Sequence, residues 1–162
     1  MSTSRRQPAP PDESAVAAMW GEFVAATGTT GQPADVYHFG DDARQADELG
    51  ALVLHGPKRA TAGLVADFEA DAIPLPQVGD HCVFVLGDGR PGGVLRTTDV
   101  RVGPLSSADA QFAWDEGEGD RSLDYWMAAH VAYCRGRCSA LGIPFSDDIE
   151  VSFERFDLVW PM

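Results

Sequence analysis

The sequence predicts an α+β fold, because helical patterns come first and strand patterns follow, with no regular alternation between the two. The 162 residues are 44% hydrophobic, which is enough for one core. They show no internal repeat and no boundary that would require a second domain. The composition excludes a disordered chain and a small disulfide-dense protein.

The first elements are helical. Residues 1–11 are rich in proline and form a disordered or extended tail. A helix begins at Asp12 or Ser14 and ends at Gly28, and together with a linker it occupies residues 12–34. Its apolar residues follow helical spacing at Val16, Met19, Trp20, Phe23 and Val24. A second helix is predicted to follow Asp41 and Asp42 and to end at Gly56.

Strand patterns dominate the rest of the chain. Residues 81–86 and 93–98 read as a hairpin around the turn at 87–90. The longest helix is predicted between Asp120, its cap, and Gly142. A final strand covers 149–160, and its apolar positions change parity, which predicts a one-residue bulge near Glu154 and Arg155.

The charge and targeting signals restrict the partners. The formal net charge of −13 gives the surface a field that repels polyanions, so any nucleic-acid contact must come from a local basic pocket. No signal-peptide pattern follows Arg5 and Arg6, and no segment reaches the roughly 18 to 20 apolar residues of a membrane span. The cysteines are few and odd in number, three in all, as expected where thiols stay reduced. We expect a soluble, cytoplasmic protein with no membrane partner.

Lys58 is the first candidate for chemistry. Eleven of the twelve basic residues are arginine, and Lys58 is the one lysine. It lies three residues before Thr61, in a glycine-bounded segment that turns out of a helix into a strand. A lysine amine can activate a threonine hydroxyl by taking its proton. The alternative is a solvated lysine beside an ordinary strand threonine.

The acidic segment from Glu116 to Ser122 is the second candidate. Its two glycines allow a close backbone approach, and its carboxylates can hold an ammonium or accept hydrogen bonds from a base or sugar. The alternative is a turn whose acidic residues stabilise the next helix.

His130, Cys134 and Cys138 lie on one helical face, but the outer two are about 12 Å apart along the axis, which is too far for one zinc ion. We interpret them as core residues, and we expect no metal and no cofactor.

Seven motifs in one order carry a family resemblance. They are Tyr37-His-Phe-Gly-Asp41, Gly56-Pro-Lys-Arg-Ala-Thr-Ala62, Pro76-Gln-Val-Gly-Asp80, Thr97-Thr-Asp-Val100, Glu116-Gly-Glu-Gly-Asp-Arg-Ser-Leu-Asp-Tyr-Trp126, His130 and Val151-Ser-Phe-Glu-Arg-Phe156. Together they resemble an ASCH-domain protein of the PUA-like superfamily. The resemblance implies a domain over residues 35–162, a small β-barrel of about five or six strands flanked by helices, with the N-terminal helix as an addition.

The resemblance also implies functions. Members of the family are linked to RNA binding, ribonuclease activity and removal of the acetyl group from N4-acetylcytidine. It implies Lys58, Thr61 and Glu116 as catalytic residues: Thr61 attacks, Lys58 transfers the proton and Glu116 orients the lysine or the base. Compact amidohydrolase relatives have an arginine shortly after the threonine, and this chain has none there. We predict that the ligand is also bound by Arg59, Arg96, Glu118, Arg121, Ser122, Tyr37 and Trp126.

Three functions stay open at this stage. The first is a hydrolase that acts on RNA or on a modified pyrimidine nucleoside in a local cleft. The second is a non-catalytic module that binds RNA or a nucleotide, with an aromatic residue stacking on the base. The third is a scaffold that works through its acidic surface. A homodimer through the helix at 12–27 is also left open.

Overall fold

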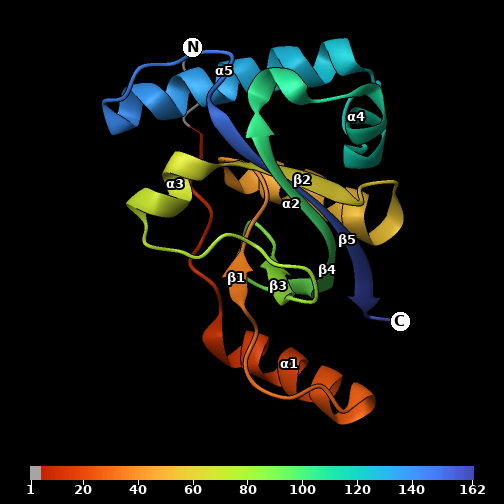
Figure 1. Ribbon diagram of the computed structural model, residues 1–162. Coiled ribbons are helices and arrows are strands. Elements are labelled where there is room, and N and C mark those ends of the chain that lie inside the picture. Colours follow the sequence, from red (N-terminus) through yellow and green to blue (C-terminus); the bar gives the residue numbers. More distant parts are fainter. Residues whose placement is uncertain (1–4) are drawn as a thin grey trace. The chain divides into compact units, whose positions relative to one another are not determined.

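The computed structural model describes residues 5–162, and these form two compact units (Figure 1). The first unit contains the segment that ends at Gly56, together with Gly79–Arg96 and Asp157–Met162. The second unit contains Pro57–Val78 and Thr97–Phe156. Two long strands contribute residues to both units: β4 (Pro91–Pro104) and β5 (Glu150–Trp160).

Five strands form one sheet in the order β1-β3-β4-β5-β2, with β1 (Asp35–Tyr37), β2 (Ala60–Leu64) and β3 (His81–Val85) as its shorter members. β1 pairs with β3 in parallel, whereas β3 pairs with β4 and β2 with β5 in antiparallel fashion. Because β1 and β2 are the edge strands in this order, the sheet is open and does not close through a pairing of β1 with β2. The α+β class, the five strands and the N-terminal helix are confirmed.

The helices of the first unit begin and end where the sequence predicts. The side chain of Asp12 caps α1 (Glu13–Thr27) by accepting a hydrogen bond from Ala15 N, and Gly28 ends the helix with φ of 73°. The side chain of Asp42 caps α2 (Ala43–His55) in the same way. The buried face of α1 packs on β3 and β4 in a core cluster formed by Val16, Trp20, Phe23, Val83, Val85 and Val94.

The proline-rich segment before α1 is extended over its described part. The backbone amide of Ala9 donates to the carbonyl of Gly87, and that of Asp12 donates to Gly89. These bonds attach the segment to the β3–β4 turn, which needs glycine because a Cβ at Gly89 would lie 2.3 Å from the carbonyl oxygen of Pro10. The first four residues of the predicted tail lie outside the described residues.

The predicted hairpin is confirmed, while two short elements were not predicted. β3 and β4 pair from His81 opposite Arg96 to Val85 opposite Pro91. The unpredicted elements are β1, which has three residues, and helix α3 (Val65–Ala70), which has six. Both are too short to show a repeated hydrophobic pattern.

The second unit holds a core between the sheet and two helices. These are α4 (Ala110–Glu116), which follows the 3-10 turn η1 (Leu105–Ser107), and α5 (Leu123–Leu141). The prediction that Asp120 caps the long helix was wrong. Ser122 is the cap, because its hydroxyl accepts from Tyr125 N, while the carboxylate of Asp120 accepts from the amide of Ser122. The core of the second unit contains Ala60, Leu64, Leu105, Phe112, Trp126, Cys134, Cys138, Val151 and Phe153.

The predicted bulge in β5 is absent from its pairing with β2. The register runs without a shift from Leu64 opposite Val151 to Ala60 opposite Arg155. The parity of the apolar residues changes because β5 is buried on both faces: Phe153 packs in the core with α4 and α5, whereas Ser152 and Phe156 are buried on the opposite face.

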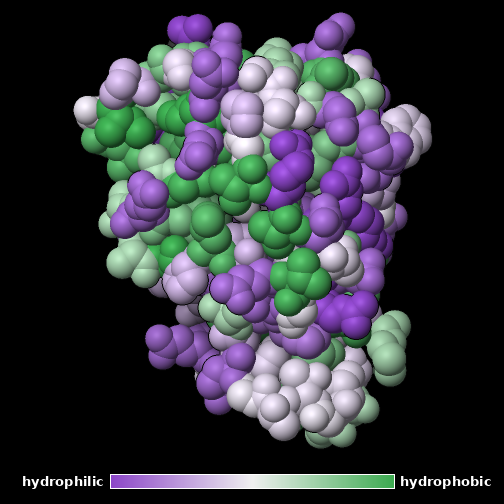
Figure 2. All heavy atoms as spheres, viewed as in Figure 1, coloured by the Kyte–Doolittle hydropathy of each residue, from purple (hydrophilic) through white to green (hydrophobic). Residues whose placement is uncertain are grey.

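The surface mixes both kinds of side chain, and Figure 2 shows hydrophilic and hydrophobic residues interspersed on the face it draws. Among residues 5–162, no helix combines the length and the apolar character that crossing a bilayer requires. The large hydrophobic residues that are exposed are Ile73, Val78, Val102, Trp114, Tyr125, Ile143 and Met162.

Candidate functional site

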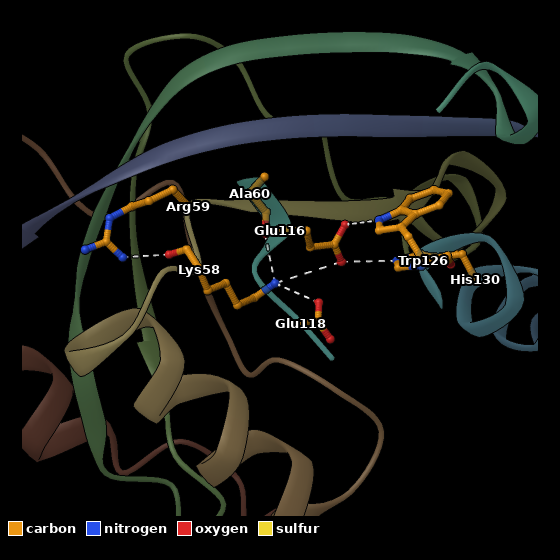
Figure 3. Close-up of polar contacts among 7 residues, drawn as sticks. All are labelled: Lys58, Arg59, Ala60, Glu116, Glu118, Trp126 and His130. Atoms are coloured by element: carbon orange, nitrogen blue, oxygen red, sulfur yellow. Dashed lines mark hydrogen bonds and ion pairs between the residues drawn. The ribbon is translucent and has the colours of Figure 1, made fainter. Parts of the chain in front are cut away.

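Lys58 is the centre of a buried polar cluster in the second unit (Figure 3). It lies just before β2 and is 1% exposed. Its Nζ donates to the carbonyl oxygen of Ala60 at 2.8 Å and to Oε2 of Glu118 at 3.0 Å, and it is 3.9 Å from Oε1 of Glu116. The solvated alternative for Lys58 is therefore wrong. A buried lysine is found in proteins when carboxylates or other acceptors compensate its charge, and this site provides both.

The acidic turn reaches Lys58 because Gly117 lets two backbones touch. Gly117 ends α4 with φ of 72°, and a Cβ there would lie 2.9 Å from the backbone nitrogen of Lys58 and from the carbonyl carbon of Pro57. Such a contact leaves no room for a side chain, and the positive φ also favours glycine. The glycine thus places Glu116 and Glu118 on either side of the lysine amine.

Helix α5 supplies two more partners for Glu116. Trp126 and His130 are one turn apart, and their rings stack with centroids 3.8 Å apart and planes inclined by 10°. The indole Nε1 of Trp126 donates to Oε2 of Glu116, and Nε2 of His130 lies 3.1 Å from Oε1. The Nδ1 of His130 bonds to the backbone carbonyl of Trp126, so Nδ1 carries a proton. Glu116 is thereby held from both sides.

The pKa values of the two carboxylates in the cluster are shifted in opposite directions. Burial alone would raise the pKa of Glu116, but the charge of Lys58 and the hydrogen bond from His130 outweigh it and lower the pKa to about 2. Burial raises the pKa of Glu118, and the neighbouring Glu116 adds to this while Lys58 opposes it. Burial also opposes a charged His130, yet Glu116 raises the pKa of the imidazole.

These shifts give the two glutamates different roles. Glu116, with a side chain that is 3% exposed, is a fixed anion that anchors Lys58, Trp126 and His130. Glu118 has a side chain that is 25% exposed, so it is the carboxyl that solvent reaches. A carboxyl with a raised pKa at the edge of a buried charge cluster is suited to exchange a proton with a ligand.

Thr61 lies in β2, one residue after the carbonyl that Lys58 binds. It is half-buried, and it stands opposite Glu154 in the pairing with β5. Among residues 5–162, the Thr61 hydroxyl makes no hydrogen bond to Lys58. The structure therefore brings Lys58 and Glu116 together and places Thr61 beside them without a bond between the hydroxyl and the amine.

The other predicted ligand-binding residues of this unit have structural partners. Figure 3 shows the Arg59 guanidinium and the Lys58 amine pointing in opposite directions, and Arg59 donates to the carbonyl of Lys58. Arg121 stacks on the ring of Trp114 at 3.6 Å and donates to its carbonyl. Ser122 caps α5. Trp126 is buried against Glu116, so it holds the cluster and offers no exposed ring for a base.

Two predicted ligand-binding residues lie in the first unit. Tyr37 ends β1, and its ring meets that of Phe39 edge-on at 5.3 Å. Arg96 stands opposite His81 in the β3–β4 pairing and is 3.7 Å from Asp157.

Sequence reasoning missed the role of His130, which it assigned to a core stripe. The stripe is confirmed for Cys134 and Cys138, which are buried free thiols. His130 differs because its ring stacks on Trp126 and turns its Nε2 to Glu116. The available signal was the four-residue spacing from Trp126, which puts both side chains on one helical face. Within residues 5–162, no group of three or more His, Cys, Asp or Glu residues is arranged to hold a metal ion.

Comparison with known proteins finds similarity over most of the chain. A family model described as "ASCH domain" matches residues 35–160. The chain is similar to the crystal structure of protein EF3133 from Enterococcus faecalis V583, with 26% identity and a TM-score of 0.83 over 91% of this chain and 89% of that one. It is also similar to an ASCH domain from Lactobacillus crispatus JV V101, with 27% identity and a TM-score of 0.81 over 90% of this chain and 94% of the other. No curated protein matches the chain.

Proposed function

This chain belongs to the ASCH-domain family, a PUA-like fold associated with RNA binding, and we propose that it is a hydrolase for a modified pyrimidine nucleoside of the N4-acetylcytidine type. The observation that carries the proposal is the buried Lys58 ammonium, which is held between an anchored carboxylate, Glu116, and a solvent-accessible one, Glu118. The Glu118 side chain is 25% exposed, and burial raises its pKa, so it is suited to exchange a proton with a ligand bound beside Lys58.

The charges of the cluster favour a neutral substrate over a phosphodiester. The positive charge of Lys58 is offset by Glu116 and Glu118, and the guanidinium of Arg59 points in the opposite direction (Figure 3). Arg121 is engaged with Trp114. Phosphate binding depends on unopposed positive charge, and the whole chain carries −13. An amide of a neutral nucleoside meets no such barrier, so RNA cleavage is the less supported of the two reactions.

Hydrolysis of the amide breaks the bond between N4 and the acyl carbon. The attacking oxygen belongs to Thr61 or to water, and the products are cytidine and acetate once water has supplied one hydroxyl and one proton. In this scheme Lys58 donates to the carbonyl oxygen, where negative charge develops. Glu118 takes the proton of the nucleophile and returns it to N4 of the leaving group. Glu116 keeps Lys58 in place.

The second candidate function is a non-catalytic module that binds RNA or a nucleotide. One observation favours it: the Lys58 amine already has acceptors in Ala60 and Glu118, and the Thr61 hydroxyl is not bonded to it. In that case the cluster would hold the turn that carries Glu118 and would not take part in turnover.

A direct assay of turnover distinguishes the hydrolase from the non-catalytic binding module. N4-acetylcytidine and a short single-stranded RNA are incubated with wild type, Lys58→Arg and Lys58→Met, and products are measured by LC-MS. We expect release of cytidine by wild type and a loss of at least about 100-fold in both variants, because neither replacement keeps a compact ammonium at this site. Arg44→Lys, on an exposed helix position, is the control for expression and folding. Binding without turnover by wild type would support the binding module.

A further inference from the structure

The imidazole of His130 faces a hydrogen-bond acceptor at each of its two nitrogens. Nδ1 lies 2.8 Å from the backbone carbonyl oxygen of Trp126, which can only accept. Nε2 lies 3.1 Å from Oε1 of Glu116, and this carboxylate is ionised at neutral pH because its pKa is lowered to about 2. An ionised carboxylate can only accept as well. A neutral imidazole has one N–H and cannot satisfy both acceptors, so the ring in this geometry is the doubly protonated imidazolium.

The surroundings of the ring also favour its charged form. The Trp126 indole stacks on the imidazole with centroids 3.8 Å apart, and the face of an indole attracts a cation. Burial opposes the charge, but Glu116 of α4 and Glu118 of the turn after α4 both raise the pKa of His130. On α5 itself, Cys134 one turn further on stays a neutral thiol, because burial raises its pKa to about 11.

Two cations compete for one oxygen atom of Glu116. Figure 3 shows this carboxylate between Lys58 on one side and Trp126 and His130 on the other. Its Oε1 is 3.1 Å from Nε2 of His130 and 3.9 Å from Nζ of Lys58. The imidazolium is therefore within hydrogen-bond distance of Oε1, whereas the ammonium is not.

We propose that His130 is a pH-dependent positioning residue for Lys58 and that it acts through Glu116. While the imidazole is charged, it holds Oε1 and keeps the carboxylate from closing on the lysine amine. When the ring loses either proton, it no longer offsets the carboxylate charge, and one of its nitrogens presents a lone pair to an acceptor. Lys58 then draws Oε1 across the 3.9 Å gap into a charge-assisted hydrogen bond.

The consequence for turnover rests on the proposed hydrolase function, in which Lys58 donates to the acyl oxygen of the substrate. An ammonium that is bonded to Glu116 presents less positive charge to that oxygen. Turnover should therefore fall as the pH rises through the pKa of His130. Glu118 as the base would give the opposite trend, because a base gains activity as it loses its proton. The falling limb thus belongs to His130.

Isotope labelling of lysine tests the coupling without a substrate. Because Lys58 is the one lysine of the chain, protein grown with lysine labelled with ¹⁵N at Nζ gives one labelled amine resonance. A pH titration follows this resonance together with the ring ¹⁵N signals of His130, which distinguish imidazolium from either neutral tautomer. His130→Gln keeps a donor toward Glu116 but does not titrate. His55→Gln, at an exposed position of α2, is the matched control.

We expect His130 to be more than half charged at pH 6.5, and the Lys58 resonance to move with the same midpoint as the His130 ring in wild type and in His55→Gln. Movement with that midpoint should be absent from His130→Gln. A neutral His130 ring at pH 6.5, or a Lys58 resonance that does not follow the ring in wild type, would overturn the inference. Both of these results come from wild type, so they do not depend on the folding of a variant.

Rates of N4-acetylcytidine hydrolysis distinguish this inference from the proposed function. If wild type hydrolyses the substrate, kcat/KM should fall about tenfold for each pH unit above the His130 midpoint, and His130→Gln should lose this fall. If the two resonances titrate together but nothing is hydrolysed, the coupling of His130 to Lys58 stands and the hydrolase proposal fails. If kcat/KM has the same pH dependence in wild type and in His130→Gln, the hydrolase proposal stands and the inference fails.

Discussion

Replacing Glu116 by glutamine should expose how much the buried cluster contributes to stability. The substitution keeps the shape of the side chain but removes the charge that faces Lys58 and His130. The charged partners lower the pKa of Glu116 from the ordinary value of 4.5 to about 2, which corresponds to roughly 3 kcal/mol of stabilisation at neutral pH. Removing one partner from a buried ion pair costs a similar amount, about 3 to 5 kcal/mol.

The pH dependence has a definite sign. Because the folded state lowers the pKa of Glu116, its contribution is present above pH 4.5 and is lost as the pH falls toward 2. The measurement is urea unfolding of wild type and Glu116→Gln at pH 7 and at steps down to pH 2.5. We expect a difference of about 3 kcal/mol at pH 7 that narrows below pH 4.5. A difference below about 1 kcal/mol at pH 7, or one independent of pH, would show that Lys58 and His130 do not stabilise the charged form of Glu116.

Three further predictions concern single side chains. Gly117→Ala should destabilise the protein by at least about 2 kcal/mol in thermal unfolding, because the new Cβ meets backbone atoms of Pro57 and Lys58. The matched Gly136→Ala, which meets nothing within 4 Å in the interior of α5, should gain about 0.5 to 1 kcal/mol, and equal effects of the two would contradict this. His130→Asn should destabilise most below pH 6.5, and its effect on urea unfolding should shrink as the pH rises through the raised pKa of His130; an effect that grows with pH would have the wrong sign. Ser152→Ala should leave the free energy of unfolding within about 0.5 kcal/mol of wild type or raise it, because the hydroxyl has no hydrogen-bond partner among residues 5–162, and a loss above about 1 kcal/mol would contradict this.

Long periodic segments could be predicted from the sequence, and short elements could not. The helices capped by Asp12 and Asp42 follow from local rules of capping and spacing, which act within a few residues. β1 is too short for such a pattern, and it exists because it pairs with β3, a partner more than 40 positions away in the sequence. The parity of β5 predicted a bulge for a related reason: burial on two faces depends on neighbours that are distant in the sequence.

The candidate site was also predicted only in part from the sequence. The rarity of lysine led to Lys58, and the two glycines led to the acidic segment from Glu116 to Ser122, whereas the role of Glu116 itself was implied by the family resemblance. The sequence did not show that Glu118 would be the accessible carboxyl, because this depends on how Gly117 packs against the backbone of Lys58. The pairing of Thr61 with Glu154 depends on the register of two strands that are distant in sequence.

On the proposed function, the Lys58 cluster is a reactive centre and more than a buried ion pair. Its most direct test is the rate of N4-acetylcytidine hydrolysis by Glu118→Gln compared with Asp120→Asn, a matched change at an exposed carboxylate two residues away. We expect Glu118→Gln to fold normally and to lose at least about 100-fold in kcat, because glutamine cannot carry the proton, whereas Asp120→Asn should retain wild-type rates. Equal rates for the two variants would show that Glu118 does not transfer a proton in the reaction.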